Sequence, residues 1–183
     1  MSLTRAELEQ FRDAAVHDLV GNVTRLAFVG VNPSLLSAAT GMHFAHPGNR
    51  FYPALRQAGI LDAGALTPED AARALIRRGV AITNLVNRAT VRADELSEVE
   101  LLLGRDRLER FVADHRPRVV AAAGITAYRV AFGQKNAKPG RQPVGIGDAE
   151  LWVVPNPSGL NAHETIASLA AAYREAAVAA GVV

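Results

Sequence analysis

Four short apolar runs, separated by segments with helical patterning, constrain the fold of this chain more than any other feature. The runs cover residues 25–31, 80–86, 118–123 and 150–154 and are rich in Val, Ala, Leu and Ile. Runs this short and this apolar are typical of strands buried on both faces of a sheet. Because parallel strands need long connections, usually helices, the alternation predicts an α/β chain: a three-layer α/β/α fold with a central, mostly parallel four-stranded sheet.

Capping patterns mark the expected helices between these runs. Thr4 and Ser97 each begin a capping box, with Glu three residues later, and Thr67 is followed by Pro at the first helical position. The expected helices cover residues 4–19, 50–58, 67–79, 97–115, 124–132 and 162–180. The segments 32–49 and 134–147 are expected to be polar loops, and a loop as long as the first is usually functional.

Length and composition predict one globular domain over residues 1–183. The chain is 49% hydrophobic and 21% charged, which is typical of a folded protein with a substantial core. It contains no cysteine, which excludes disulfides, thiolate zinc sites, iron–sulfur clusters and a cysteine nucleophile. Its five histidines show no metal-ligand spacing, so we expect neither a metal nor another cofactor.

The chain shows no feature of a membrane or exported protein. Its first residues lack the apolar core of a signal peptide, and no stretch of about 18 apolar residues without charge occurs. We therefore expect a cytoplasmic protein that does not bind membranes.

The charge of the chain is unevenly distributed, although the net charge is only +2. No acidic residue lies in the windows 19–61, bounded by Asp18 and Asp62, and 115–147, bounded by Asp114 and Asp148. The second window contains six Arg and Lys residues, and such segments attract polyanions. Buried strands also lack acidic residues, so charge alone leaves nucleic-acid binding undecided.

The tripeptide Asn-Pro-Ser occurs twice, each time directly after an apolar run. The copies begin at Asn32 and at Asn156, and a third polar segment begins at Asn84, near the end of the second run. In an open parallel sheet the ligand binds at the carboxyl ends of the strands, so these loops are expected to face one cleft. Proline fixes the backbone beside each of the two Asn residues of the repeated tripeptide. The sequence therefore predicts a site that presents amide groups rather than strong acids or bases.

Three motifs, in this order and spacing, resemble a known family. They are residues 30–33 (Gly-Val-Asn-Pro), 44–51 (Phe-Ala-His-Pro-Gly-Asn-Arg-Phe) and 156–160 (Asn-Pro-Ser-Gly-Leu). The chain is similar over about residues 25–180 to the mismatch-specific uracil/thymine DNA glycosylases, a branch of the uracil-DNA glycosylase superfamily. The resemblance implies a monomer that takes a mispaired or damaged pyrimidine out of double-stranded DNA and cleaves its N-glycosidic bond without a cofactor.

The resemblance assigns Asn32 to the position that orients the attacking water. An amide can position water but is not a useful general base near pH 7, so slow turnover is expected. Asn32 could instead simply begin an Asx turn. Asp94 follows the third loop and could supply the missing carboxylate if that loop folds over the pocket; the alternative is a solvated residue that leads into the next helix.

The resemblance also assigns the residues that hold the base. Phe44 would stack on the flipped base, a contact that contributes roughly 1–3 kcal/mol. Asn84 would hydrogen-bond the pyrimidine edge, and Val31, Ser37 and His46 would complete the pocket. The alternatives are a core position for Phe44 and a strand-end turn for Asn84, and a structural role in shaping the loop is favoured for His46.

The second Asn-Pro-Ser loop would insert into the duplex. Leu160, flanked by Gly159 and Asn161, would fill the space that the flipped nucleotide leaves. The family often has Ser-Arg after this Leu, whereas Asn161-Ala162 stands here, so reading of an opposing guanine would depend more on the backbone. The remaining members of this DNA-contacting segment, expected to grip phosphate or shape the pocket, are Asn156, Pro157 and Ser158.

The expected product is an intact abasic strand. A lyase step needs an amine nucleophile, and the only lysines are Lys135 and Lys138, which lie in a polar loop away from the motifs. The rival function is a mismatch- or nucleotide-binding module without catalysis. A serine hydrolase and a P-loop protein are disfavoured because neither Gly-x-Ser-x-Gly nor the P-loop motif occurs.

Overall fold

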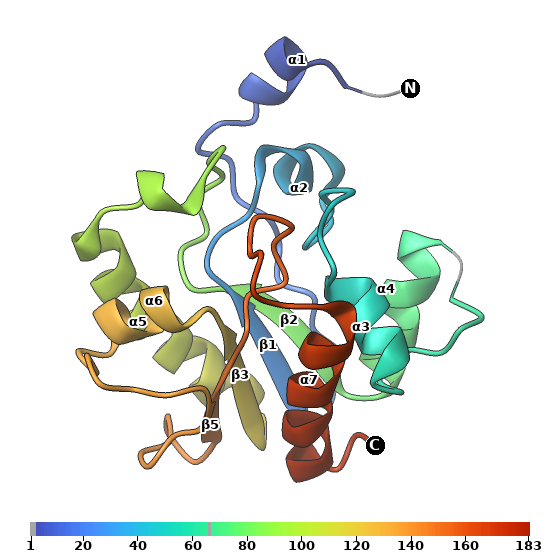
Figure 1. The fold of residues 1–183 in the computed structure, drawn as a ribbon, viewed down its shortest axis with the longest axis vertical. Coiled ribbons are helices and arrows are strands. Elements are labelled where there is room, and N and C mark those ends of the chain that lie inside the picture. The colour runs from blue at the N-terminus through green and yellow to red at the C-terminus, as the bar shows by residue number, and fades with distance from the viewer. Residues whose placement is uncertain (1–2, 66) are drawn as a thin grey trace.

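A five-stranded sheet in the order β2-β1-β3-β5-β4 forms the centre of the molecule (Figure 1). The structure is a computed structural model that describes residues 3–65 and 67–183. The four longer strands run parallel, as predicted, and are β1 (Leu26–Gly30), β2 (Val80–Asn84), β3 (Val119–Ala123) and β5 (Glu150–Val154). The fifth, β4 (Gly140–Arg141), pairs antiparallel with β5 at the edge of the sheet. A two-residue Gly-Arg strand carries no apolar pattern, which is why the sequence predicts four strands.

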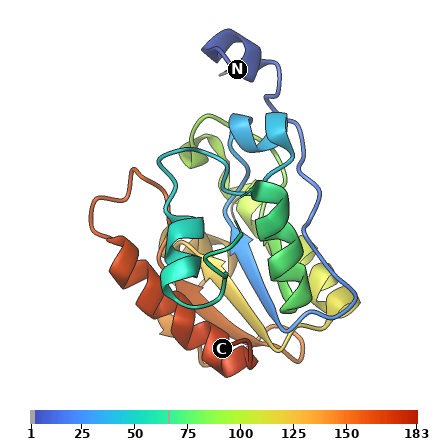
Figure 2. The ribbon, with the colours of Figure 1, turned by 90° about the vertical axis from the view of Figure 1, so that its right-hand side faces the viewer.

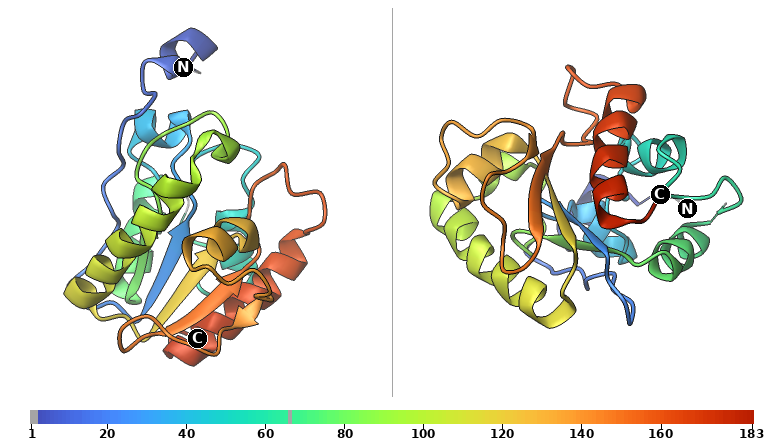
Figure 3. Two further views of the ribbon diagram at one scale, coloured as in Figure 1. Left: turned by 90° about the vertical axis from the view of Figure 1, so that its left-hand side faces the viewer. Right: turned by 90° about the horizontal axis from the view of Figure 1, so that it is seen from below.

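Helices cover both faces of the sheet and complete the three predicted layers. One face is covered by α3, α4 and α7, and the other by α5 and α6 (Figure 3). The α-helices of the described residues are α1 (Arg5–Glu9), α2 (Leu35–Thr40), α3 (Phe51–Gln57), α4 (Pro68–Arg77), α5 (Glu98–His115), α6 (Ile125–Ala131) and α7 (Ile166–Ala180). A short 3-10 helix, η1 (Ala93–Glu95), precedes α5.

Alternate residues of each strand enter separate cores on the two faces. In β1, Phe28 packs with Phe51 of α3 and Tyr173 of α7, at ring-centroid distances of 5.2 Å for both pairs. Its neighbour Val29 belongs to the other core, with Leu108 of α5. Burial on both faces explains why the strands read as continuous apolar runs rather than as alternating patterns.

The first helix is shorter than predicted, because it ends at Glu9 rather than near residue 19. The chain then turns at Asp13, whose φ is +63°, and runs as an extended arm beside β2 (Figure 2). The Asp13 N–H donates to the carbonyl of Ala89, and Leu19 exchanges two backbone hydrogen bonds of 2.9 Å with Ile82. Pairing with the sheet edge therefore overrides the local helical preference of this segment.

The predicted loop over residues 32–49 contains the helix α2. Ser34 caps it by accepting from the Ser37 N–H at 3.1 Å, and Gly41 ends it with a φ of +70°. Only six residues are helical, too few to show an amphipathic period in the sequence.

The carboxyl ends of the parallel strands all lie at the same end of the sheet, the end near α2. In Figure 1 the blue α2, the orange-red loop before α7 and the green segment before α5 all lie above the sheet. Among the described residues, no helix combines the length and apolar character needed to cross a bilayer.

Candidate active site

A cavity of about 470 Å³ lies at the carboxyl ends of the strands, within the size range of small-ligand sites. Strand-end loops and the loop between α2 and α3 form its wall. The predicted site residues that line it are Val31, Asn32, Ser37, Phe44, His46, Asn84, Asp94, Asn156, Ser158, Gly159 and Leu160. Pro157 and Asn161 belong to the same loop as the last four but do not line the cavity.

Asn32 is held with its amide oxygen available. Its Nδ2 donates to the carbonyl of Arg88 at 2.9 Å and to Thr90 Oγ1 at 2.7 Å. The Thr90 hydroxyl gives its own proton to the Arg92 carbonyl, so it can only accept from Asn32. Both partners therefore require the NH₂ group, which fixes the amide orientation and leaves Oδ1 as a hydrogen-bond acceptor.

The Asn32 partners are held by an ion-pair cluster behind the cavity. The Arg88 guanidinium donates to Glu100 at 2.6 Å and to Asp13 at 2.7 Å, which joins the third loop to α5 and the N-terminal arm. Hydrogen bonds from Arg88, and then from the backbone of Ser97, lower the pKa of Glu100 to about 2. The roles of Thr90 and Arg88 were not predicted, because nothing in the spacing of the chain indicates which loop contacts Asn32.

Phe44 offers a rigid aromatic face to the cavity. Its φ of +56° is unusual for a bulky residue, and such strain is concentrated at functional sites. Its ring stacks on Phe51 with centroids 4.0 Å apart. The next residue, Ala45, donates its N–H to the buried Ser37 hydroxyl at 3.3 Å, which fastens the Phe44 loop to α2.

Asn84 ends β2 directly opposite Gly30 of β1. A Cβ atom at Gly30 would lie 2.6 Å from Asn84 Oδ1 and 3.3 Å from Phe44 Cζ. Glycine at this position therefore makes room for both side chains. Asn84 is buried, and its Nδ2 lies 3.3 Å from Nδ1 of the buried His43.

The loop between β5 and α7 projects one apolar side chain, since Leu160 is 87% exposed. The loop is internally tied: Asn156 Oδ1 accepts from the Ser158 N–H at 3.0 Å, and Asn161 Nδ2 donates to the Asn156 carbonyl at 3.1 Å. A Cβ at Gly159 would lie 2.6 Å from the carbonyl oxygen of Gly48, so only glycine fits there. The residues 156–161 are named the projecting loop below.

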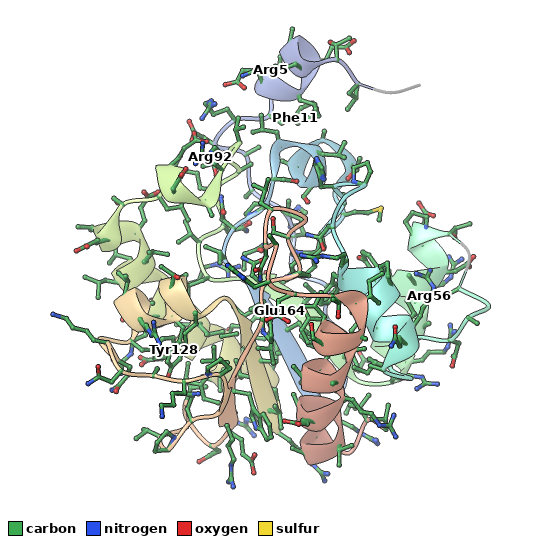
Figure 4. The ribbon with its side chains drawn as sticks, in the orientation of Figure 1. Arg5, Phe11, Arg56, Arg92, Tyr128 and Glu164 are labelled. Carbon is green, nitrogen blue, oxygen red and sulfur yellow. The ribbon has the colours of Figure 1, made fainter. Side chains whose placement is uncertain are left out.

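Arg50 fastens the projecting loop from behind. Its guanidinium donates to three backbone carbonyl oxygens, those of Ser158 at 2.5 Å, Asn161 at 2.8 Å and Glu164. The backbone N–H of Arg50 also donates to the carbonyl oxygen of Pro157 at 3.0 Å. Glu164 lies two residues before α7 and is labelled in Figure 4. Arg50 lies in the first acid-free window, and its side chain turns inward to backbone carbonyls.

Asp94 and His46 lie at the rim of the cavity. The Asp94 side chain is 62% exposed and pairs with Arg92 at 2.5 Å, in the segment before α5 where Figure 4 labels Arg92. His46 Nδ1 accepts from the Gly48 N–H at 3.1 Å and so shapes its own turn. Neither Lys135 nor Lys138 is among the described residues that line the cavity.

Fold and cavity together define an α/β/α domain with a cavity at the carboxyl ends of its strands, lined by amides, hydroxyls and an aromatic ring, with Asp94 and His46 at its rim. The model of the uracil DNA glycosylase superfamily matches residues 18–178, and the chain belongs to this superfamily. The resemblance noted in the sequence is thus confirmed at the level of the superfamily. Membership supports a uracil DNA glycosylase activity in general, with DNA as the substrate.

A solved structure supports the fold. The solution NMR structure of a protein from Methanosarcina acetivorans, whose assignment as a uracil DNA glycosylase is itself provisional, matches with a TM-score of 0.59 and 15% sequence identity. The match covers 88% of this chain and 96% of that chain. At this identity the likeness shows a common fold, in agreement with the predicted α/β/α architecture.

Proposed function

We propose that this chain is a monofunctional, mismatch-specific DNA glycosylase that excises uracil paired with guanine, and thymine or ethenocytosine as further candidate bases. The observation that carries the proposal is the fixed amide of Asn32, a residue that lines the same cavity as Phe44 and Asn84 and whose Oδ1 remains an acceptor. This arrangement has a water-positioning group, a stacking face and a base-edge reader around one space of suitable size.

The geometry suggests how each group would act. The flipped base stacks on Phe44, and the Asn84 amide hydrogen-bonds its edge. A water that donates to Asn32 Oδ1 attacks the sugar carbon, while the N-glycosidic bond breaks and its electron pair leaves with the base. The proton that the water loses passes through solvent to the base anion, so the products are the free base and a hydroxyl on the sugar. Because an amide does not take up the proton, departure of a stabilised base anion has to supply most of the rate.

The projecting loop is suited to replace the flipped nucleotide. Apolar side chains inserted between base steps hold a duplex open, and Leu160, at 87% exposed, is more exposed than Val91, the other exposed large apolar side chain at the cavity. Weak pairing in a G·U or G·T wobble lowers the cost of extrusion, which is a few kcal/mol. This favours mispaired over well-paired bases.

Asp94 is proposed as a carboxylate that assists Asn32. Its place at the cavity rim supports this, while its pairing with Arg92 means that the carboxylate has to exchange partners when DNA binds. In the variant Asp94→Asn, single-turnover cleavage should fall strongly while binding to mismatched DNA is retained. An unchanged cleavage rate would exclude the role.

A glycosylase assay tests the whole proposal. End-labelled duplexes with G·U, A·U or G·T, and single-stranded uracil DNA, are incubated with EDTA and then treated with hot alkali. We expect the G·U strand to break only after the alkali treatment. We also expect the Asn32→Ala variant to give no such breaks. Breaks before alkali would contradict a monofunctional enzyme, and mismatch binding without base release at stoichiometric protein would indicate the non-catalytic module.

A further inference from the structure

His43 is a buried titratable residue that the proposed mechanism does not use. It is 5% exposed and belongs to the cavity wall beside Asn84. Its Nε2 lies 3.0 Å from the carbonyl oxygen of His17 in the N-terminal arm. A carbonyl oxygen only accepts, so Nε2 carries the proton and Nδ1 of the neutral ring has a lone pair.

The ring is held neutral by its surroundings. Burial lowers the pKa of His43 and outweighs the opposing effects of the His17 carbonyl and of Asp18, while Arg107 of α5 acts in the same direction as burial. Asp18 and Arg107 bind each other at 3.0 Å, so their charges largely cancel at His43.

The neutral ring determines which way the Asn84 amide faces. Because Nδ1 of His43 can only accept, the group 3.3 Å from it must be the NH₂ of Asn84. Asn84 Oδ1 is then directed toward the space over Gly30, where a Cβ would lie 2.6 Å from it. The hydrogen bond to His43 thus fixes one amide orientation, and the missing Cβ at Gly30 leaves room for the oxygen.

That orientation matters because the two pyrimidine edges are opposite. Uracil and thymine present an O4 acceptor beside an N3–H donor, whereas cytosine presents an N4 donor beside an N3 acceptor. In one pose, an amide complements only one of these patterns, and rotation by 180° exchanges its NH₂ and oxygen. We propose that His43 is a positioning residue that locks Asn84 in the orientation that complements uracil and thymine and rejects cytosine. The assignment rests on the proposed function of the cavity.

A matched pair of variants tests whether His43 fixes the orientation of the Asn84 amide, which is called the lock below. His43→Leu has no acceptor toward Asn84, whereas the carbonyl oxygen of His43→Asn replaces Nδ1. Duplexes carry 2′-fluoro-deoxyuridine or 2′-fluoro-deoxycytidine opposite an abasic site, so that neither base is paired and the fluorine disfavours the cationic sugar of the cleavage step. We expect the uracil-over-cytosine affinity ratio to fall roughly tenfold or more in His43→Leu, as for loss of a buried hydrogen bond, and to survive in His43→Asn.

The outcomes separate this inference from the proposed function. If the wild type releases uracil but both variants keep its base preference, or His43→Asn loses as much as His43→Leu, the lock is overturned while the glycosylase stands. If the wild type releases no base yet shows the preference and loses it only in His43→Leu, the glycosylase is overturned and the lock stands.

A measurement on the wild type covers the case in which a variant does not fold. ¹⁵N NMR of the imidazole rings distinguishes a protonated Nε2 from a protonated Nδ1, and the His43→Asn spectrum, or stepwise removal of the other four histidines, identifies the signal. The lock requires a bare Nδ1 at pH 7. A His43 ring with its proton on Nδ1 would overturn it.

Discussion

Removal of the Arg50 guanidinium should loosen the projecting loop without unfolding the protein. In the structure this group donates to three backbone carbonyls, those of Ser158, Asn161 and Glu164. Arg50→Met keeps much of the aliphatic stem and removes all three hydrogen bonds. Arg50→Lys keeps the charge as a matched control, although one ammonium cannot reproduce the fork of the guanidinium.

The size of the effect follows from these contacts. Three hydrogen bonds at about 1 kcal/mol each give about 3 kcal/mol in favour of the closed loop. Arg50 Nε is buried without a partner in the described structure, and removing this unsatisfied group returns about 1 kcal/mol. The loop should therefore open more easily by about 2 kcal/mol, which corresponds to roughly thirtyfold faster hydrogen exchange of the Ser158 and Asn161 amides.

Activity gives the second readout for Arg50. A loosened loop impairs insertion into a duplex, so cleavage of a G·U duplex should fall more than cleavage of uracil in single-stranded DNA, where no base has to be unstacked. Exchange is measured by mass spectrometry and cleavage in single turnovers. Equal losses on both substrates, or unchanged exchange in the loop, would refute the reasoning.

Three further predictions concern Asn32, the projecting loop and the ion pairs. Thr90→Val should reduce single-turnover cleavage about tenfold and stability by about 1 kcal/mol, because the amide of Asn32 loses its shortest hydrogen bond. Thr90→Ser should restore both the cleavage rate and the stability, and no change of either in Thr90→Val would contradict this role. Leu160→Ala should leave the melting temperature unchanged, because the side chain is 87% exposed, and should weaken binding to duplexes but not to single strands in a titration. The pKa of Glu100 is lowered on folding to about 2, so its pairing with Arg88 stabilises the fold above pH 4.5 and this contribution disappears as the pH falls toward 2. Glu100→Gln should thus cost about 1 kcal/mol in urea unfolding at pH 7, after allowance for solvent screening, and almost nothing near pH 2, whereas an equal cost at both would be inconsistent with this linkage.

The parallel strands and most helices could be predicted because their signals are local. A strand buried on both faces is apolar throughout, as in β1 (Leu26–Gly30), and the capping box at Ser97 marks the start of α5 within one residue. The helix predicted after Glu9 does not form, because the conformation of this segment depends on partners more than sixty residues away, such as Ala89 and Ile82. No window of sequence contains that pairing.

In the candidate site, too, local signals could be predicted and long-range contacts could not. The polar strand-end segments predicted residues around the cavity, since Asn32 lies two residues after β1 and Asn84 is the last residue of β2. The residues that orient them, Thr90 and His43, were not assigned these roles, because a hydrogen bond between loops leaves no periodicity or spacing behind. The sequence analysis assigns Arg50 no role of its own, and only its environment shows that it binds carbonyl oxygens.

The N-terminal arm also decides how the sheet meets other chains. An uncovered outer strand offers its backbone to any extended segment that collides with it, which begins aggregation. The arm occupies that side of β2 through the pair of Leu19 and Ile82, and at the opposite side β4 (Gly140–Arg141) is only two residues long. Because the arm has to close a long loop to reach β2, the sheet is exposed to self-association in the interval before the arm docks.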